Sequence, residues 1–89
     1  MKLCIPRMCF KVKVKSVRVM KEYSCLHGLL PKNELPRHLR GKIPLDEVWM
    51  RQDVYDNQEN RKDTLKHERK ELILMTQGVP YPIAHKRAG

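Results

Sequence analysis

One stretch of the chain places a histidine and two carboxylates at the spacing of a helical face. Residues 64–72 read TLKHERKEL. At roughly 100° per residue, a helix turns His67, Glu68 and Glu71 into one sector, flanked by its leucines. A half-buried carboxylate needs a partner. This face therefore predicts a bound metal ion, a proton held by a raised pKa, or an arginine from elsewhere in the chain.

Two segments upstream have the pattern of strands on which such a helix could pack. Residues Phe10–Lys15 alternate strictly between apolar and basic side chains, which indicates a strand with one face on a core. After Lys15-Ser16 the apolar residues shift by one position, to Val17 and Val19, which is the change that a β-bulge produces. Leu45–Tyr55 predicts a second strand, rich in valine and aromatic residues.

The helix itself has recognisable start and stop signals. Asp56 with Glu59 three positions later resembles a capping box, and Gly78 with Pro80 ends the pattern. A helix over about 59–77 follows, and residues 81–88 predict a short closing helix.

Between the two predicted strands, glycines and prolines leave room only for short helical turns. We expect them around Cys25–Leu30 and Glu34–Leu39. Together these elements predict one α+β domain over residues 1–89, in which a small antiparallel sheet or strand pair packs on one long helix, with a short C-terminal helix.

Charge and hydropathy narrow the classes of partner. The formal net charge of +9 favours polyanions, of which nucleic acid is the commonest. No apolar run approaches the roughly 20 residues that span a bilayer, and the N-terminus lacks a secretory apolar core. We therefore expect no membrane partner and a cytoplasmic location.

The predicted strand, the polar turn and the helix together resemble a known enzyme family. Over about Val48–Met75 the order is similar to the run into the active-site helix of zincin-type metallopeptidases, where an edge strand precedes a helix bearing H-E-x-x-H. In that family the two histidines bind zinc, and the glutamate beside the first is the general base.

The resemblance implies a role for each matching residue. His67 would be the first zinc ligand and Glu68 the base, while Glu71 stands where the second histidine would be. Glutamate keeps the one-turn spacing and binds zinc through oxygen, but it makes the metal less electrophilic. His85, in the C-terminal segment, is the available third ligand. The resemblance thus implies a divalent-metal site, with zinc preferred, and a possible hydrolase.

Two other interpretations of the same helix stay open. Glu68 or Glu71 could pair with basic side chains, for which the sequence offers Arg51, Arg61, Lys86 and Arg87. The chain could also have kept a zincin-like shape and lost the metal.

The cysteines permit a second metal hypothesis. Cys4, Cys9, Cys25 and His27 would supply a Cys₃His zinc set, but their spacings lack the usual knuckle glycine. Buried, apolar cysteines are the simpler explanation. An odd number of cysteines rules out a closed disulfide framework without a partner chain or a free thiol. His38, between arginines, is expected on the surface.

A basic nucleic-acid-binding or adaptor protein is the alternative function. Its candidate contacts form one stripe on the first predicted strand and one on the long helix: Lys11, Lys13, Lys15, Lys62, Lys66, Arg69 and Lys70. Scattered aromatic residues give no stacking platform, and no nucleic-acid-binding motif is present. The competing explanation is that the strand lysines prevent edge-to-edge pairing.

Overall fold

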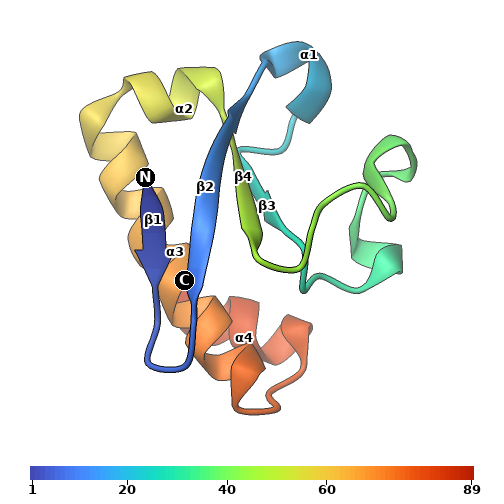
Figure 1. Ribbon diagram of the computed structural model, residues 1–89, viewed down its shortest axis with the longest axis vertical. Helices are drawn as coiled ribbons and strands as arrows, with labels where there is room; N and C mark the ends of the chain where they lie inside the picture. Colours follow the sequence, from blue (N-terminus) through green and yellow to red (C-terminus); the bar gives the residue numbers. More distant parts are fainter.

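A four-stranded mixed sheet forms the centre of the molecule, as the computed structural model of residues 1–89 shows (Figure 1). The strands are β1 (Lys2–Cys4), β2 (Cys9–Lys15), β3 (Cys25–His27) and β4 (Glu47–Arg51), in the spatial order β1-β2-β4-β3. The outer pairs are antiparallel and β2 runs parallel to β4. The predicted α+β class is confirmed, but the predicted small antiparallel sheet or strand pair is a four-stranded mixed sheet, in which the two strands expected from the sequence, β2 and β4, run parallel.

Alternation along β2 separates a core face from an outer face. Phe10 and Val12 are buried, whereas Lys11 and Lys13 are exposed on the other side. The strand lies inside the sheet, between β1 and β4, so its lysines do not protect a free edge. No bulge follows. The strand ends at Lys15 and a single helical turn, α1 (Val17–Met20), begins after Ser16, whose side chain caps it.

The second predicted strand is shorter than expected. Strand β4 ends at Arg51, and the five-residue helix α2 (Gln52–Asp56) follows directly. The Arg51 guanidinium donates to the Asp53 carboxylate and to the carbonyl of Lys21, which fixes the chain reversal. Val54 lies one helical turn after Met50 and packs in the same core. The apolar residues that the sequence suggested as one strand therefore belong to a strand and a helix.

The long helix α3 (Gln58–Thr76) packs on the core face of the sheet, as predicted within one residue at each end. Its N-cap is Asn57, whose side chain accepts from the Asn60 amide at 3.0 Å, rather than the expected Asp56. At the other end Gly78 adopts a φ of 93°, and the amide of Val79 bonds back to the Leu74 carbonyl. This left-handed glycine reverses the chain.

The closing helix α4 (Tyr81–Ala88) lies against the C-terminal part of α3 (Figure 1). Its bounds are those predicted. Pro80 precedes it in an extended conformation, and Ala84, fully buried, bonds through its amide to the Pro80 carbonyl. The tight turn after α3 therefore brings residues of α4 back over the helix that carries His67.

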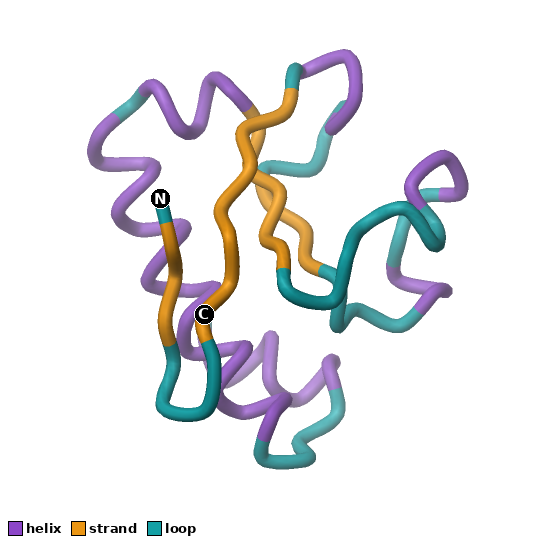
Figure 2. Tube along the Cα trace, in the orientation of Figure 1, coloured by secondary structure: helices purple, strands orange, loops and turns teal.

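Two apolar clusters lie on opposite faces of the sheet. The first, between sheet and α3, includes Phe10, Val48, Met50 and Leu72. The second is covered by loops, drawn teal in Figure 2, and by two single turns, η1 (Lys32–Glu34) and η2 (Arg37–Leu39). The turns near 34–39 were expected. The helical turn expected at 25–30 is wrong, because Cys25–His27 form β3 on the edge of β4 and only residues 28–30 turn.

The loop after β3 passes unusually close to the segment before β4. A β-carbon on Gly28 would stand 2.0 Å from the carbonyl oxygen of Pro44, well inside contact distance. Glycine is required here by close approach rather than by a positive φ.

The cysteines contradict the Cys₃His hypothesis. Cys4 and Cys9 form a disulfide that closes the β1–β2 hairpin, and Cys25 is free. Cys4 and Cys9 are also exposed rather than buried. His38 is not a free surface residue either, because its Nε2 lies 2.7 Å from the carbonyl oxygen of Val19.

Candidate metal centre

Three elements meet at one edge of the sheet and bring together histidines from distant parts of the chain. Strand β3 lies at this edge, and its register with β4 (Cys25 opposite Met50, His27 opposite Val48) turns Cys25 and His27 toward α3. The face of α3 that carries Glu68 and Glu71 packs opposite them, and α4 contributes His85.

Glu71 is the centre of this arrangement. Its side chain is 2% exposed, and each oxygen has its own histidine. Oε2 lies 3.0 Å from Nε2 of His27, and Oε1 lies 2.9 Å from Nδ1 of His85. Burial alone would raise the pKa of Glu71, but the hydrogen bonds from His27 and His85 outweigh it and lower that pKa. The carboxylate is therefore ionised at neutral pH.

His67 and His85 direct ring nitrogens at each other. Nε2 of His67 lies 3.3 Å from Nδ1 of His85, the same nitrogen that faces Glu71. A neutral His85 has at most one proton on Nδ1, so it cannot donate fully to both neighbours. Three electron-rich atoms thus converge on one point, where a cation would be stabilised.

Glu68 is buried without a strong partner. It is 6% exposed, and its Oε2 has no hydrogen bond and lies 3.8 Å from Nε2 of His27. Burial raises the pKa of Glu68 well above its ordinary value of 4.5, and the neighbouring Glu71 carboxylate raises it further. Nδ1 of the fully buried His27 is likewise unpartnered.

Two sets of side chains have the donor spacing of a metal site. One is His67, Glu71 and His85, and the other is His27, Glu68 and Glu71; within each set the donor atoms lie within 4.8 Å of one another. Ligands about 2.0–2.1 Å from a tetrahedral zinc ion stand about 3.3–3.4 Å apart. The observed separations between donors in the first set, 2.9 and 3.3 Å, are close to this value. Either set could hold a metal ion; the first is partly exposed at His67 and His85, and the second is buried throughout.

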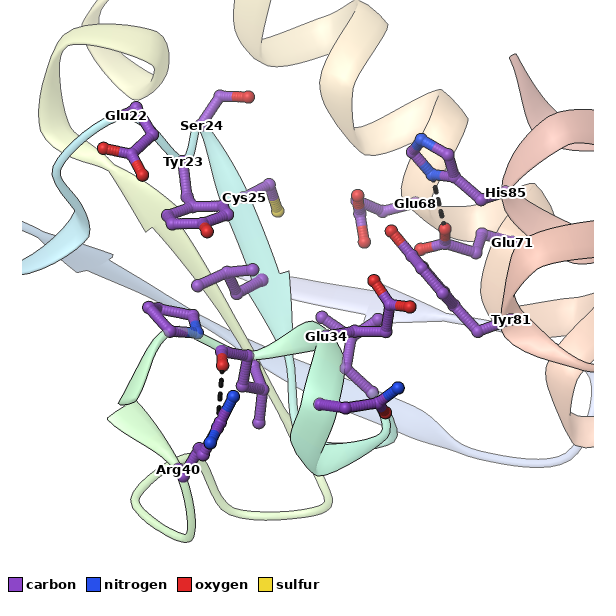
Figure 3. Close-up of a pocket in the computed structure, with 15 residues that line it drawn as sticks. Glu22, Tyr23, Ser24, Cys25, Glu34, Arg40, Glu68, Glu71, Tyr81 and His85 are labelled. Carbon is purple, nitrogen blue, oxygen red and sulfur yellow. Dashed lines mark hydrogen bonds and ion pairs between the residues drawn. The ribbon is translucent and has the colours of Figure 1, made fainter. Parts of the chain in front are cut away.

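A cleft of about 540 Å³ opens beside the cluster (Figure 3). Tyr23 and Cys25 lie on one side, and Glu68, Glu71 and Tyr81 on the other. A second hollow of about 290 Å³ reaches His67 and His85. The side chains of Glu68, Glu71, His67 and His85 therefore border hollows that small molecules could enter.

The cleft is acidic in an otherwise basic protein. Its walls carry Glu22, Glu34, Glu68 and Glu71, which are four of the ten acidic residues in the chain. The pKa of Tyr81 rises to about 12, first through burial and then through the nearby glutamates. Burial, followed by Glu68 and Glu71, also raises the pKa of the Cys25 thiol. A concentration of negative charge favours cations at this place.

The two glutamates of the helix face the protein interior as predicted, but they do not pair with arginine or lysine side chains. Glu68 and Glu71 lie on the packed side of α3, with Lys66 and Lys70 exposed. Arg51 pairs with Asp53, and Arg61 donates to the carbonyl of Tyr55. The ion pairs of the two glutamates are with histidines, and neither Lys86 nor Arg87 takes part.

Sequence reasoning missed the role of His27. The Cys₃His hypothesis places it in a site with the cysteines, whereas in the structure it contacts Glu71, 44 positions away. The only local signal was the alternation Cys25-Leu26-His27, in which the histidine shares the inner face with the cysteine. Tyr81, which tilts over the His85 ring with centroids 5.3 Å apart, was also not singled out.

The predicted basic contacts fall on two surfaces that point away from each other. Lys11 and Lys13 project from the sheet face opposite α3, whereas Lys62, Lys66 and Lys70 are exposed on the far side of that helix. Lys15 packs over the Trp49 ring at 4.3 Å. Arg69 donates to the carbonyl of Cys4 at 3.1 Å. The seven residues therefore do not form one continuous interface.

Comparison with protein-family models, with curated proteins and with solved structures gives no match. Among the helices, none combines the length and the apolarity that crossing a bilayer requires.

Proposed function

We propose that this protein binds a zinc ion through Nε2 of His67, Oε1 of Glu71 and Nδ1 of His85. The observation that carries the proposal is the convergence of these three atoms, at 3.3 and 2.9 Å, from two helices joined by a tight turn. A lone hydrogen-bonding histidine pair needs only one short contact. Here Nδ1 of His85 faces both a carboxylate oxygen and a second ring nitrogen, and a metal ion can bind all three atoms whereas one proton cannot bridge them all.

The ligand types favour zinc. Two histidines and one glutamate, with a fourth position left for water, are a ligand set of catalytic zinc sites. His85 is more than half exposed, so the fourth position of this site faces solvent and the hollows beside it. The similarity to the zincin active-site helix, with Glu71 in the place of the second histidine, supports the same ion.

Glu68 is the candidate general base for hydrolysis at this metal. It follows His67 directly, lines both hollows and has a carboxyl group whose pKa is raised by burial, and then by Glu71. A raised pKa suits a group that takes a proton from a zinc-bound water and returns it. Exchange of Glu68 for glutamine should then leave the zinc in place and remove any hydrolysis.

The proposal is tested by measuring zinc in the purified protein after chelator treatment and reloading. We expect His67→Ala to lower bound zinc by one equivalent per chain, because the ion loses one of three ligands. His38→Ala is the matched control, since it removes a histidine that bonds only to a backbone carbonyl. Zinc content in His67→Ala equal to that of the wild type, or a wild-type chain that takes up no zinc, would contradict the proposal.

We propose polyanion binding on the outer face of β1 and β2 as a second candidate function. Lys2 and Lys11 stand directly opposite each other in the strand register, and Lys13 is exposed on the same face. Like charges placed opposite each other destabilise a sheet, and Asp46, 3.9 Å from Lys11, compensates only in part. A row of phosphates would neutralise this face.

We expect Lys11→Gln with Lys13→Gln to weaken binding to duplex DNA of mixed sequence and to lower the salt slope by about 2, one for each lost phosphate contact. Binding is measured by fluorescence anisotropy over a salt series. Lys62→Gln with Lys66→Gln, on the far side of α3, serves as a charge-matched control. An unchanged slope in the strand variant would assign these lysines to solubility.

A further inference from the structure

Glu71 uses its two carboxylate oxygens in opposite directions. Oε1 faces His85 near the surface, and Oε2 faces His27, which is fully buried between β3 and α3. A carboxylate placed in this way, with His27 at one oxygen and His85 at the other, has the geometry of a bridging ligand. The zinc site proposed above employs only the outer oxygen.

A second set of donors surrounds the inner oxygen. Nε2 of His27 lies 3.0 Å from Oε2 of Glu71 and 3.8 Å from Oε2 of Glu68. These distances bracket the donor separation of about 3.3–3.4 Å expected around a tetrahedral ion. Histidine and carboxylate ligands from β3 and α3 thus surround a point deeper in the fold than the outer site.

The inner set contains an atom that the protein alone does not satisfy. Oε2 of Glu68 is buried and makes no hydrogen bond, in a side chain that is 8% exposed and whose Oε2 lies 3.8 Å from Nε2 of His27. An unpaired buried carboxyl oxygen is costly, because it loses its hydration and receives nothing in return. A cation beside it would remove this cost and would also offset the repulsion between the two glutamates.

We propose that the protein holds two divalent ions bridged by Glu71. The outer ion is bound by His67, His85 and Oε1 of Glu71, and the inner ion by His27, Glu68 and Oε2 of Glu71. This proposal rests on the zinc site proposed above and adds a second ion to it. Two ions that share a carboxylate stand about 3.5–4 Å apart, the separation of two-metal hydrolytic sites.

The two sites differ in ligand chemistry and therefore in the ions they prefer. The outer site has two imidazoles and one carboxylate, which suit zinc. The inner site has one imidazole and two carboxylates, so its larger share of oxygen donors also accepts manganese. In this arrangement Glu68 is a ligand rather than a general base, which changes what its substitution does.

Metal stoichiometry separates these roles. The metal-free full chain is titrated with Zn²⁺ by calorimetry, and the bound ion is counted by elemental analysis. We expect two equivalents in the wild type and one in each of Glu68→Gln, His27→Gln and His67→Ala. Circular dichroism and thermal unfolding serve to check that each variant is folded. Glu68→Gln is the principal variant, because glutamine has nearly the size of glutamate and can occupy the same buried position without a charge.

The bridge itself has a spectroscopic signature. With Mn²⁺ in both sites, electron paramagnetic resonance should show an exchange-coupled pair, and Glu68→Gln should restore the hyperfine pattern of an isolated ion. One equivalent in the wild type, unchanged in Glu68→Gln and His27→Gln but lost in His67→Ala, would overturn the second ion while leaving the zinc proposal intact. A wild type that binds neither Zn²⁺ nor Mn²⁺ would overturn both.

Discussion

Exchange of Glu71 for glutamine should remove essentially all specific metal binding. Glutamine has nearly the same shape as glutamate, but its neutral amide presents only one oxygen and a nitrogen that is no ligand. We expect zinc affinity to fall by at least about 100-fold, because losing even an outer-shell partner costs roughly 10–100-fold. Competition titration against a chromophoric chelator measures the change.

A matched control lies on the same helix. Glu59→Gln removes an equal charge from the exposed first turn of α3, so it reports any effect of net charge alone. Unaltered zinc affinity in Glu71→Gln, with the wild-type value also in Glu59→Gln, would show that the metal is bound elsewhere. The variant also tests the fold, since His27 and His85 both lose an ionised partner.

Exchange of Glu68 for glutamine should stabilise the metal-free protein at neutral pH. Burial, and then the Glu71 carboxylate, raise the pKa of Glu68 above its ordinary value of 4.5. A group whose pKa is raised by folding contributes its full stability below the unfolded value and loses it as pH rises toward the folded value. At pH 7 the wild type therefore carries a penalty, which is about 1.4 kcal/mol for each pH unit from the unfolded pKa up to the folded pKa or up to pH 7, whichever is lower.

The variant does not titrate, so its advantage should grow with pH and vanish in acid. A gain of 1 kcal/mol raises the unfolding temperature of a domain of this size by about 4–8 °C. Melting curves at pH 4 and pH 7.5, recorded with chelator, measure the difference. Glu59→Gln again controls for charge. Equal melting temperatures of wild type and Glu68→Gln at pH 7.5 would mean that the buried carboxyl has found a partner.

Glu71 has the opposite dependence on pH. Its pKa is lowered by its histidine hydrogen bonds despite burial, so its contribution is present above 4.5 and is lost in acid. The two neighbouring carboxyls therefore act in opposite senses between acid and neutral pH. The comparison of Glu68→Gln with wild type reports Glu68 together with its interaction with Glu71, because the Glu71 carboxylate is one of the groups that raise the pKa of Glu68.

Local patterns predicted the elements that are regular over many residues. The charged and apolar sectors of α3, its stop at Gly78 and the bounds of α4 follow from side-chain periodicity and from glycine and proline conformations. The inward face of Glu68 and Glu71 followed in the same way, because an angular sector of a long helix is a local property. The proximity of His85 followed from the short turn.

Pairings between distant segments could not be predicted. Strand β3 has only three residues, and its pattern is decided by the exposed edge of β4, more than 20 positions away. The same is true of His27, which no spacing rule connects to Glu71. Val54 was wrongly predicted to lie in a strand, although its local pattern was clear. An apolar residue four positions after Met50 suits a strand or a turn of helix, and the structure takes the helix.

The close approach at Gly28 limits how this site can vary. The residue has no functional group, yet any β-carbon there would meet the carbonyl oxygen of Pro44 at 2.0 Å and force β3 away from the segment before β4. The imidazole of His27, one position earlier, would move with the strand. Its Nε2, now 3.0 Å from Oε2 of Glu71, would then lose this contact. A substitution at Gly28 would therefore disturb the inner set of donors as much as the loss of one of its side chains. Gly28 is thus constrained by the site although it has no side chain that could take part in the chemistry.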